Sequence, residues 1–269
     1  MSYGLAAASR LAGKVILITG ASSGIGEATA FEYANAAKGE IKLALSARRF
    51  EKLEDLKEKL ISQWPNIKVH IASLDVSNVA KLTEYVESLP EEFKAVDVLV
   101  NNAGKALGVD KVGQILQEDI DGMFQTNVIG LISLTQLILP GMKARNRGDI
   151  IQLGSIAGRD PYPGGGIYCA TKAAVRSFSH SLRKELIDTK IRVIEIDPGA
   201  VQTEFSVVRY KGSKESASKV YEGAEPLNAL DIAELIVFAS TRRENTVVAE
   251  TLVFPTNQAS ASHVYRKKD

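Results

Sequence analysis

Short apolar runs alternate with amphipathic stretches along most of the chain. The first run covers residues 15–18, and helical spacing follows over 22–38. The next run covers 41–45, and the charged stretch 50–63 after it places leucines on one helical face. The same alternation predicts further strands at 68–72, 96–100, 149–153, 192–196 and 246–253, and helices at 78–89, 118–145, 166–188 and 231–240.

Continuous β-branched runs between helices are typical of a parallel sheet with both faces covered. Right-handed crossovers then predict a doubly wound, Rossmann-type α/β fold. No linker, repeat or low-complexity tract divides the chain, so we expect one domain over residues 1–269. The polar segment at about 199–227 lies between a strand and a helix, and its length predicts a loop that covers the substrate.

Composition narrows the function classes. The chain has 33 Lys and Arg against 32 Asp and Glu, which gives no overall field for nucleic acid or anionic lipid. One cysteine and three histidines exclude an internal disulfide and a cysteine-rich zinc site, and no metal is expected. The apolar stretch 128–140 is too short and too polar to span a membrane. Residues 1–14 lack the apolar core of a signal peptide, so we expect a cytoplasmic protein.

A glycine-rich turn follows the first predicted strand and opens the first long helix. Glycines permit a close backbone approach to a pyrophosphate, and the helix N-terminus favours negative charge. The turn could also be a ligand-free strand-to-helix connection. Its spacing is Gly-x-x-x-Gly-x-Gly, and its candidate cofactor contacts are Gly20, Ser22, Ser23, Gly24, Ile25 and Gly26.

The end of the second strand indicates which dinucleotide binds. An acidic residue there suits the ribose hydroxyls of NAD, whereas Arg48 and Arg49 stand here. A guanidinium can form two hydrogen bonds with a 2′-phosphate, which a carboxylate would repel. The sequence therefore predicts NADP(H), although both arginines could also be solvated charges at a helix start.

The motifs together resemble the short-chain dehydrogenase/reductase family. The resemblance extends from about residue 14 to 253 and rests on the segments 19–26, 101–104 and 198–199, with Asn127, Ser155, and Tyr168 four residues before Lys172. The segments 102–108, 154–158 and 203–209 resemble a narrower branch, the NADP-dependent 3-hydroxy acid dehydrogenases of the serine or L-allo-threonine type, yeast members above all.

The resemblance implies about seven parallel strands, a homotetramer and roles for matching residues. Asn127, Ser155, Tyr168 and Lys172 would be catalytic, with Asn127 positioning a water and Ser155 holding the substrate oxygen. Ser23 departs from the pattern, because many NADP-using relatives carry a basic residue there. The further implied cofactor contacts are Asp75, Val76, Asn101, Asn102, Ala103, Gly104, Tyr168, Lys172, Pro198, Val201 and Thr203.

Tyr168 and Lys172 point to acid–base chemistry at a carbonyl or carbinol. A free tyrosine has a pKa near ~10 and is a poor base at neutral pH. A lysine four residues later on a helix lies on the same face, and its charge favours the phenolate. We therefore expect Lys172 to lower the pKa of Tyr168, which would exchange the proton while NADP(H) exchanges the hydride.

The substrate is less constrained by the sequence. A hydroxy acid needs a cation for its carboxylate, and Arg159, Arg209 and Lys105 are candidates. Arg209 is preferred because its loop should close over the substrate, and Tyr162 could contact the substrate too. Three functions stay open: a dehydrogenase for small 3-hydroxy acids, a broad NADPH carbonyl reductase for aldehydes and ketones, and a non-catalytic NADP(H)-sensing protein. The third is disfavoured by the complete set of catalytic residue types.

Overall fold

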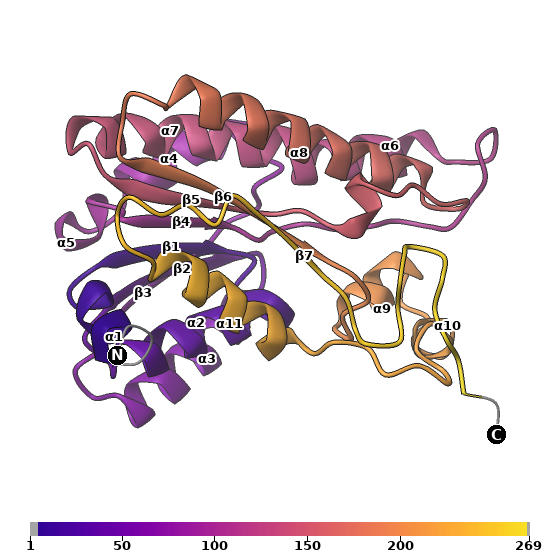
Figure 1. The fold of residues 1–269 in the computed structure, drawn as a ribbon, viewed down its shortest axis with the longest axis horizontal. Coiled ribbons are helices and arrows are strands. Elements are labelled where there is room, and N and C mark those ends of the chain that lie inside the picture. Colours follow the sequence, from indigo (N-terminus) through magenta and orange to yellow (C-terminus); the bar gives the residue numbers. More distant parts are fainter. Residues whose placement is uncertain (1–4, 268–269) are drawn as a thin grey trace.

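A single parallel sheet organises the chain. The computed structural model describes residues 5–267, so the outermost residues of the predicted 1–269 domain lie outside the described part. The sheet has seven strands in the order β3-β2-β1-β4-β5-β6-β7, which confirms the doubly wound Rossmann-type fold (Figure 1). The strands are β1 (Val15–Thr19), β2 (Lys42–Ala47), β3 (Lys68–Ser73), β4 (Val98–Asn101), β5 (Gly148–Leu153), β6 (Ile191–Pro198) and β7 (Glu250–Val253).

Helices cover both faces of the sheet and bury two apolar clusters (Figure 1). The leucine face predicted for 50–63 is buried as expected, with Leu53, Leu56 and Leu60 in the core. One layer contains α1 (Leu5–Leu11), α2 (Gly24–Ala36), α3 (Phe50–Gln63) and α11 (Ala229–Ser240). The other contains α4 (Leu82–Glu87), α6 (Gln117–Phe124), α7 (Leu131–Ala144) and α8 (Gly166–Glu185).

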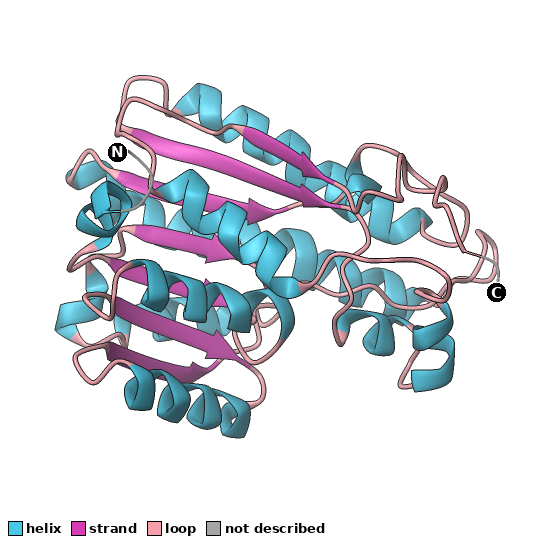
Figure 2. Cartoon of the chain, turned by 60° about the horizontal axis from the view of Figure 1, so that its bottom comes forward, coloured by secondary structure: helices cyan, strands magenta, loops and turns pink. Residues whose placement is uncertain are grey.

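The strand order reverses between β1 and β4. All strands are parallel, so their carboxyl ends meet at one edge, and the arrows in Figure 2 point toward the lobe that carries α9 (Phe205–Arg209) and α10 (Lys214–Lys219). A crevice forms at such a reversal because the connecting loops on its two sides leave toward opposite faces. The fold therefore positions a ligand site between the ends of β1 and β4.

The predicted helix 118–145 is present as one continuous helical stretch, Gln117–Ala144, with a π-helical turn inside it. A π-helical turn over Gln125–Gly130 separates α6 from α7, and such turns often occur at functional sites. Gly130 packs closely against the backbone that follows β3. A Cβ added at Gly130 would sit 2.2 Å from the Val76 carbonyl oxygen. By length and composition the stretch Gln117–Ala144 could cross a membrane, but half of its most apolar window is buried inside the protein, as in a core helix.

Other sequence predictions differ from the structure in detail. The segment 199–227 is not one irregular loop: it contains α9 and α10, and its ends are joined by a bridge between Val201 and Leu227. The last strand is shorter than predicted, since residues 246–249 are not in the sheet. The predicted helix 78–89 is a 3₁₀ turn (Val79–Lys81) followed by α4, and the short helices α1 and α5 (Glu91–Lys94) were not predicted.

Candidate active site

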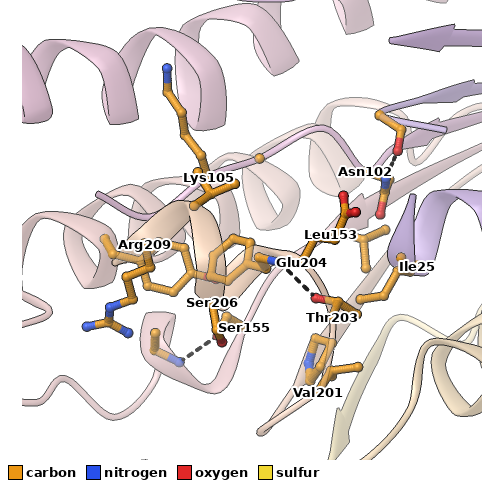
Figure 3. A pocket seen from close by; sticks show the side chains of 18 of the residues that line it. Ile25, Asn102, Lys105, Leu153, Ser155, Val201, Thr203, Glu204, Ser206 and Arg209 are labelled. Carbon is orange, nitrogen blue, oxygen red and sulfur yellow. Dashed lines mark hydrogen bonds between the residues drawn. The ribbon is translucent and has the colours of Figure 1, made fainter. Parts of the chain in front are cut away.

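A cavity of about 740 Å³ lies at the carboxyl ends of the central strands (Figure 3). It brings together side chains from the glycine turn, from the ends of β2 to β6, from the start of α8 and from the 199–227 segment. The sequence-predicted residues in its wall are Gly20, Ser22, Ser23, Gly24, Ile25, Arg48, Arg49, Asp75, Val76, Asn102, Ala103, Gly104, Ser155, Tyr162, Tyr168, Lys172, Pro198, Val201, Thr203 and Arg209.

The glycine turn has a backbone shape that other residues would rarely adopt. Gly20 has φ +66° and Gly24 has φ +58°, both in the left-handed region. Gly26 is not in the cavity wall; a Cβ there would lie 2.4 Å from the Gly20 carbonyl oxygen. The turn thus exposes backbone N–H groups at the N-terminus of α2, which is an arrangement that could hold a pyrophosphate.

Arg49 lies across this turn. Its guanidinium donates hydrogen bonds to the Ser23 hydroxyl at 2.7 Å and to the Ser22 hydroxyl at 3.3 Å. It also forms an ion pair with Glu204 at 2.9 Å, a residue that the sequence analysis did not single out. This pair lowers the pKa of Glu204 and connects the turn to the segment that leads into α9. Arg48 lines the same part of the cavity.

Asp75 lies further along the same wall. Its carboxylate accepts hydrogen bonds from the Ser77 backbone N–H at 3.0 Å and from the Ser77 hydroxyl at 2.7 Å. Burial raises the pKa of Asp75, but these hydrogen bonds and the charges of Arg48 and Lys105 outweigh it and lower the pKa. The carboxylate is therefore charged at neutral pH and oriented by a local turn.

Two predicted asparagines are buried behind the cavity wall. Asn101 donates to the Thr135 hydroxyl and to the Gln152 side chain, so it braces the strands. Asn127, in the π-helical turn, donates to the Lys105 carbonyl oxygen and accepts from the Lys105 N–H, both at 2.8 Å. Its amide also donates to Thr171 on α8 at 3.1 Å. Asn127 thus ties the loop after β4 to α8.

Ser155, Tyr168 and Lys172 meet at the centre of the cavity, with Lys172 one helical turn after Tyr168. The Lys172 ammonium lies 5.9 Å from the centroid of the Tyr168 ring and donates to the Leu153 carbonyl oxygen at 2.5 Å. Burial lowers the pKa of Lys172 to about 8, against the attraction of Asp197 and Glu195. The two side chains share one face of α8, as the spacing predicted.

The expected depression of the tyrosine pKa is not found in this structure. Burial raises the pKa of Tyr168, and the Ser155 hydroxyl and the charge of Arg209 only partly offset it. The physical reason is the burial of the phenol, while the Lys172 ammonium donates its hydrogen bond to the Leu153 carbonyl oxygen at the end of β5. The phenol is consequently protonated at neutral pH, which is the form that donates a proton.

Two buried carboxyl groups, those of Asp197 and Glu195, lie next to the backbone at Gly154 and Ser155. Asp197, at the end of β6 and 1% exposed, accepts the Ser155 backbone N–H at 3.0 Å and the Arg159 Nε–H at 2.7 Å. Arg159 also pairs with Glu250, so this candidate substrate cation is engaged in the interior and does not line the cavity. Glu195 is fully buried, and burial followed by repulsion from Asp197 raises its pKa strongly.

The short helix α9 covers the cavity beside Tyr168. Phe205 packs on Tyr168 with ring centroids 5.5 Å apart. Arg209, four residues later, donates to the Tyr162 hydroxyl at 2.8 Å and to the Gly164 carbonyl oxygen at 3.2 Å. In Figure 3, Arg209 and Ile25 lie on opposite sides of the cavity, with Thr203 between them.

The comparisons with known proteins agree with this geometry. The family model for short chain dehydrogenase matches residues 14–213, the part that holds the glycine turn and the Tyr168–Lys172 pair. The chain belongs to the short-chain dehydrogenase family. The resemblance stated from the motifs is thereby confirmed, and family membership extends over most of the chain.

Individual relatives cover almost the whole length. The NADP-dependent 3-hydroxy acid dehydrogenase of Schizosaccharomyces pombe is 54% identical over 97% of this chain and 99% of its own. The NADP-dependent 3-hydroxy acid dehydrogenase YdfG of Escherichia coli (strain K12) is 40% identical over 94% of this chain. The solved closed form of a serine dehydrogenase complexed with NADP+ matches with a TM-score of 0.87 and 40% identity, covering 94% of this chain and 100% of its own.

Several functional positions were not evident from the sequence. Asp197, Glu195, Glu204 and Phe205 contribute to the site through contacts between segments that are far apart in the chain. Glu195 had no local signal, whereas Asp197 immediately precedes the Pro198-Gly199 motif, and Glu204 and Phe205 lie in the segment 203–209 noted for its resemblance. Within residues 5–267, no group of three or more His, Cys, Asp or Glu side chains is placed to hold a metal ion.

Proposed function

We propose that this chain is an NADP-dependent dehydrogenase that oxidises small 3-hydroxy acids, such as serine or L-allo-threonine, or reduces the corresponding keto forms. The observation that carries the proposal is one cavity that joins Ser155, Tyr168 and Lys172 to a glycine turn flanked by two arginines. The names of the relatives from Schizosaccharomyces pombe and Escherichia coli support the cofactor and the substrate class.

The residues present fit a 2′-phosphorylated dinucleotide. Ser22, Ser23 and Arg49 form a polar cluster at the N-terminus of α2, and Arg48 adds a second cation beside it. Asp75 and Val76 would contact the adenine, and the 101–104 segment, Pro198, Val201 and Thr203 would line the rest of the cofactor. Bound NADP(H) supplies or accepts the hydride, and the protein supplies orientation and proton transfer.

Tyr168 exchanges the proton in the proposed reaction. Its protonated phenol donates to the developing alkoxide in reduction, and the phenolate accepts the carbinol proton in oxidation. Ser155 holds the substrate oxygen next to this phenol, since its hydroxyl is the group that interacts with Tyr168. Together they stabilise the charge that develops on that oxygen.

Lys172, whose ammonium lies 5.9 Å from the centroid of the Tyr168 ring, would favour the phenolate that forms in oxidation and would contact the cofactor ribose. Asn127 holds the loop after β4 against α8, and through its position in the π-helical turn it would place a water that carries protons to Lys172. The segment 199–227 would act as the lid over the substrate, with α9 as the part that touches Tyr168.

The proposal is tested by a screen of small hydroxy acids and amino alcohols with NADP and with NAD, in which the absorbance of the reduced nicotinamide is followed. We expect turnover of serine, L-allo-threonine or a 3-hydroxy acid with NADP. A neutral diketone is the comparison substrate. If kcat/KM for the diketone with NADPH exceeds that for every hydroxy acid, the broad carbonyl reductase is the better description.

Cofactor choice gives the first mutational prediction. Replacing Arg48 and Arg49 together with alanine should raise KM for NADP by about ten- to hundredfold, because charge-assisted hydrogen bonds to the phosphate contribute about 1.5–3 kcal/mol. KM for NAD should change little, since NAD lacks that phosphate. The prediction is checked by measuring KM for NADP and for NAD in steady-state kinetics of the parent and the variant. Equal increases for NADP and NAD would contradict the assignment of these arginines.

Assembly and compartment extend the proposal. We infer a homotetramer in the cytoplasm that acts on a small molecule and binds neither nucleic acid nor membrane. The near balance of charges supports the absence of a nucleic-acid partner. Light scattering coupled to size-exclusion chromatography should give four times the mass of one chain. A monomer would contradict the tetramer and leave the proposed chemistry intact.

A further inference from the structure

Most of the cationic side chains in the cavity wall have an acidic neighbour. Arg49 is paired with Glu204, and Lys172 is attracted to the buried Asp197 and Glu195. Arg48 interacts with Asp75. Four of the cations that line the cavity (Arg48, Arg49, Lys105 and Lys172) therefore have an acidic neighbour, Lys105 being near both Asp75 and Asp119.

Arg209, the remaining cation of the cavity wall, has no ion-pair partner within the described residues 5–267. A guanidinium has five N–H donors, and here one is used on the Tyr162 hydroxyl and one on the Gly164 carbonyl oxygen. The Nε atom is buried without a hydrogen-bond partner. A buried donor without a partner is unfavourable, and the second N–H on each of Nη1 and Nη2 is left to donate to a ligand.

The position of Arg209 is fixed by its neighbours. The guanidinium carbon lies 5.3 Å from the centroid of the Tyr162 ring, and the Arg209 carbonyl oxygen accepts the Gly108 N–H at 2.9 Å. Three segments thus meet at Arg209: the loop after β4 contacts its backbone on α9, and the loop before α8 contacts its side chain. A planar fork held this rigidly is suited to a carboxylate or another flat or tetrahedral oxyanion.

Arg209 also lies close to the reacting group. Phe205 and Arg209 are four residues apart, so they lie on one face of α9, and Phe205 packs on Tyr168. Arg209 is close enough to Tyr168 for its charge to act on the phenol. It is on the opposite side of the cavity from Ile25 in the glycine turn, so it is not part of the arginine pair proposed for the cofactor phosphate (Figure 3).

We propose that Arg209, oriented by Tyr162 and Gly164, binds the anionic group of the substrate and so selects small alcohols that carry a carboxylate near the carbinol. This inference rests on the proposed function and deepens it. The other two candidate cations are less suitable: Arg159 is held by Asp197 and Glu250, and the Lys105 ammonium lies near Gly122 on α6.

The test uses two substrates of nearly the same shape, one with a carboxylate and one with an uncharged amide in its place. For the full-length enzyme, kcat/KM is measured with 3-hydroxybutyrate and with its amide, 3-hydroxybutyramide. Arg209→Gln should lower kcat/KM for the carboxylate by about ten- to hundredfold, the loss expected for hydrogen bonds to a charged group, and change that for the amide by less than about threefold. Arg209→Lys should recover part of the loss, because it restores the charge without the fork.

A matched control separates this role from a general effect of charge in the lid. Lys211 is two residues away, pairs with Asp119 and does not line the cavity. Lys211→Gln should leave the carboxylate-to-amide ratio at the parent value. An equal fall for both substrates in Arg209→Gln would show that Arg209 only supports the lid, and an unchanged carboxylate value would also overturn the proposal.

A second readout does not require the hydroxy acid to be a substrate. Butyrate should inhibit the reduction of a neutral diketone competitively, and Arg209→Gln should raise its inhibition constant at least about tenfold. If the parent reduces the diketone, ignores hydroxy acids and is still inhibited through Arg209, the substrate class fails while the anion site stands. An inhibition constant that does not depend on Arg209 would overturn the anion site itself.

Discussion

Tyr168→Phe should lower kcat by about 10²–10⁴, because it removes the group that exchanges the proton with the substrate oxygen. The change deletes one oxygen and preserves the ring, so the packing of Phe205 against it should survive. Binding of NADP should be nearly unchanged, and titration calorimetry can verify that. The loss should appear in kcat for both directions of the reaction, since the same phenol donates in one and accepts in the other.

Tyr85→Phe is the matched control for this change. Tyr85 is also buried, but it lies on α4 and does not line the cavity. Its variant should retain the parent kcat. If Tyr168→Phe turned over as fast as the parent, the proposed mechanism would be wrong, and a non-catalytic protein that binds NADP(H) would become the better interpretation.

Asp197 is expected to have the largest effect on stability. Leaving a buried donor without its acceptor typically costs about 1–3 kcal/mol, and Asp197 accepts from two such donors, although Arg159 keeps its pair with Glu250. Asp197→Ala would leave both the Ser155 N–H and the Arg159 Nε–H without their acceptor. Chemical denaturation should therefore show a loss of that size, and kcat should fall because the backbone that orients Ser155 is released. A loss below about 1 kcal/mol would contradict this account.

The charge of Asp197 can be separated from its hydrogen bonds. Asp197→Asn keeps an oxygen for the Ser155 N–H but removes a negative charge that holds up the pKa of Lys172. That pKa, about 8 in the parent, should decrease, so the alkaline limb of kcat/KM should move to lower pH. Lys172 would then be deprotonated at a pH where the parent is still charged.

Glu195 should partly compensate for this loss. Repulsion from Asp197 contributes to its raised pKa, so Glu195 should ionise more readily in Asp197→Asn and restore a negative charge near Lys172. The double variant Glu195→Gln with Asp197→Asn removes both charges and should shift the alkaline limb further than either single change. If Asp197→Asn, Glu195→Gln and the double variant all show the pH profile of the parent, Asp197 and Glu195 do not act on Lys172.

The fold was largely predictable because its signals are local. Continuous apolar runs identified all seven strands, and the switch from strand to helix placed the glycine turn. The π-helical turn inside the 118–145 helix was not predictable, because a hydrophobic repeat does not distinguish a single π-helical turn from the α-helix on either side of it. The helices α9 and α10 were missed because they have only five and six residues, too few to show a helical repeat, and they pack against each other.

The site was predictable where a motif fixes a backbone shape or a spacing. Tyr168 and Lys172 share a helix face because they are four residues apart. The roles of Asp197 and Glu204 were not, because each depends on a partner that is distant in sequence, Ser155 in one case and Arg49 in the other. Burial also reversed the expected direction of the Tyr168 pKa, and burial is a property of the assembled fold.

The cavity is divided along the chain in a way that bears on how such enzymes diversify. Residues up to about 105 form the part of the cavity proposed for the adenine and the phosphates, and residues from 155 onward supply the proton donor, most of the surface around the substrate and the remaining proposed cofactor contacts. Substitutions at Tyr162, Phe205 or Arg209 can therefore alter which alcohol is accepted while the part proposed for the adenine and the phosphates keeps its shape. The surfaces proposed for the adenine and phosphates and for the substrate are carried by one sheet, on the two sides of the β1–β4 pair.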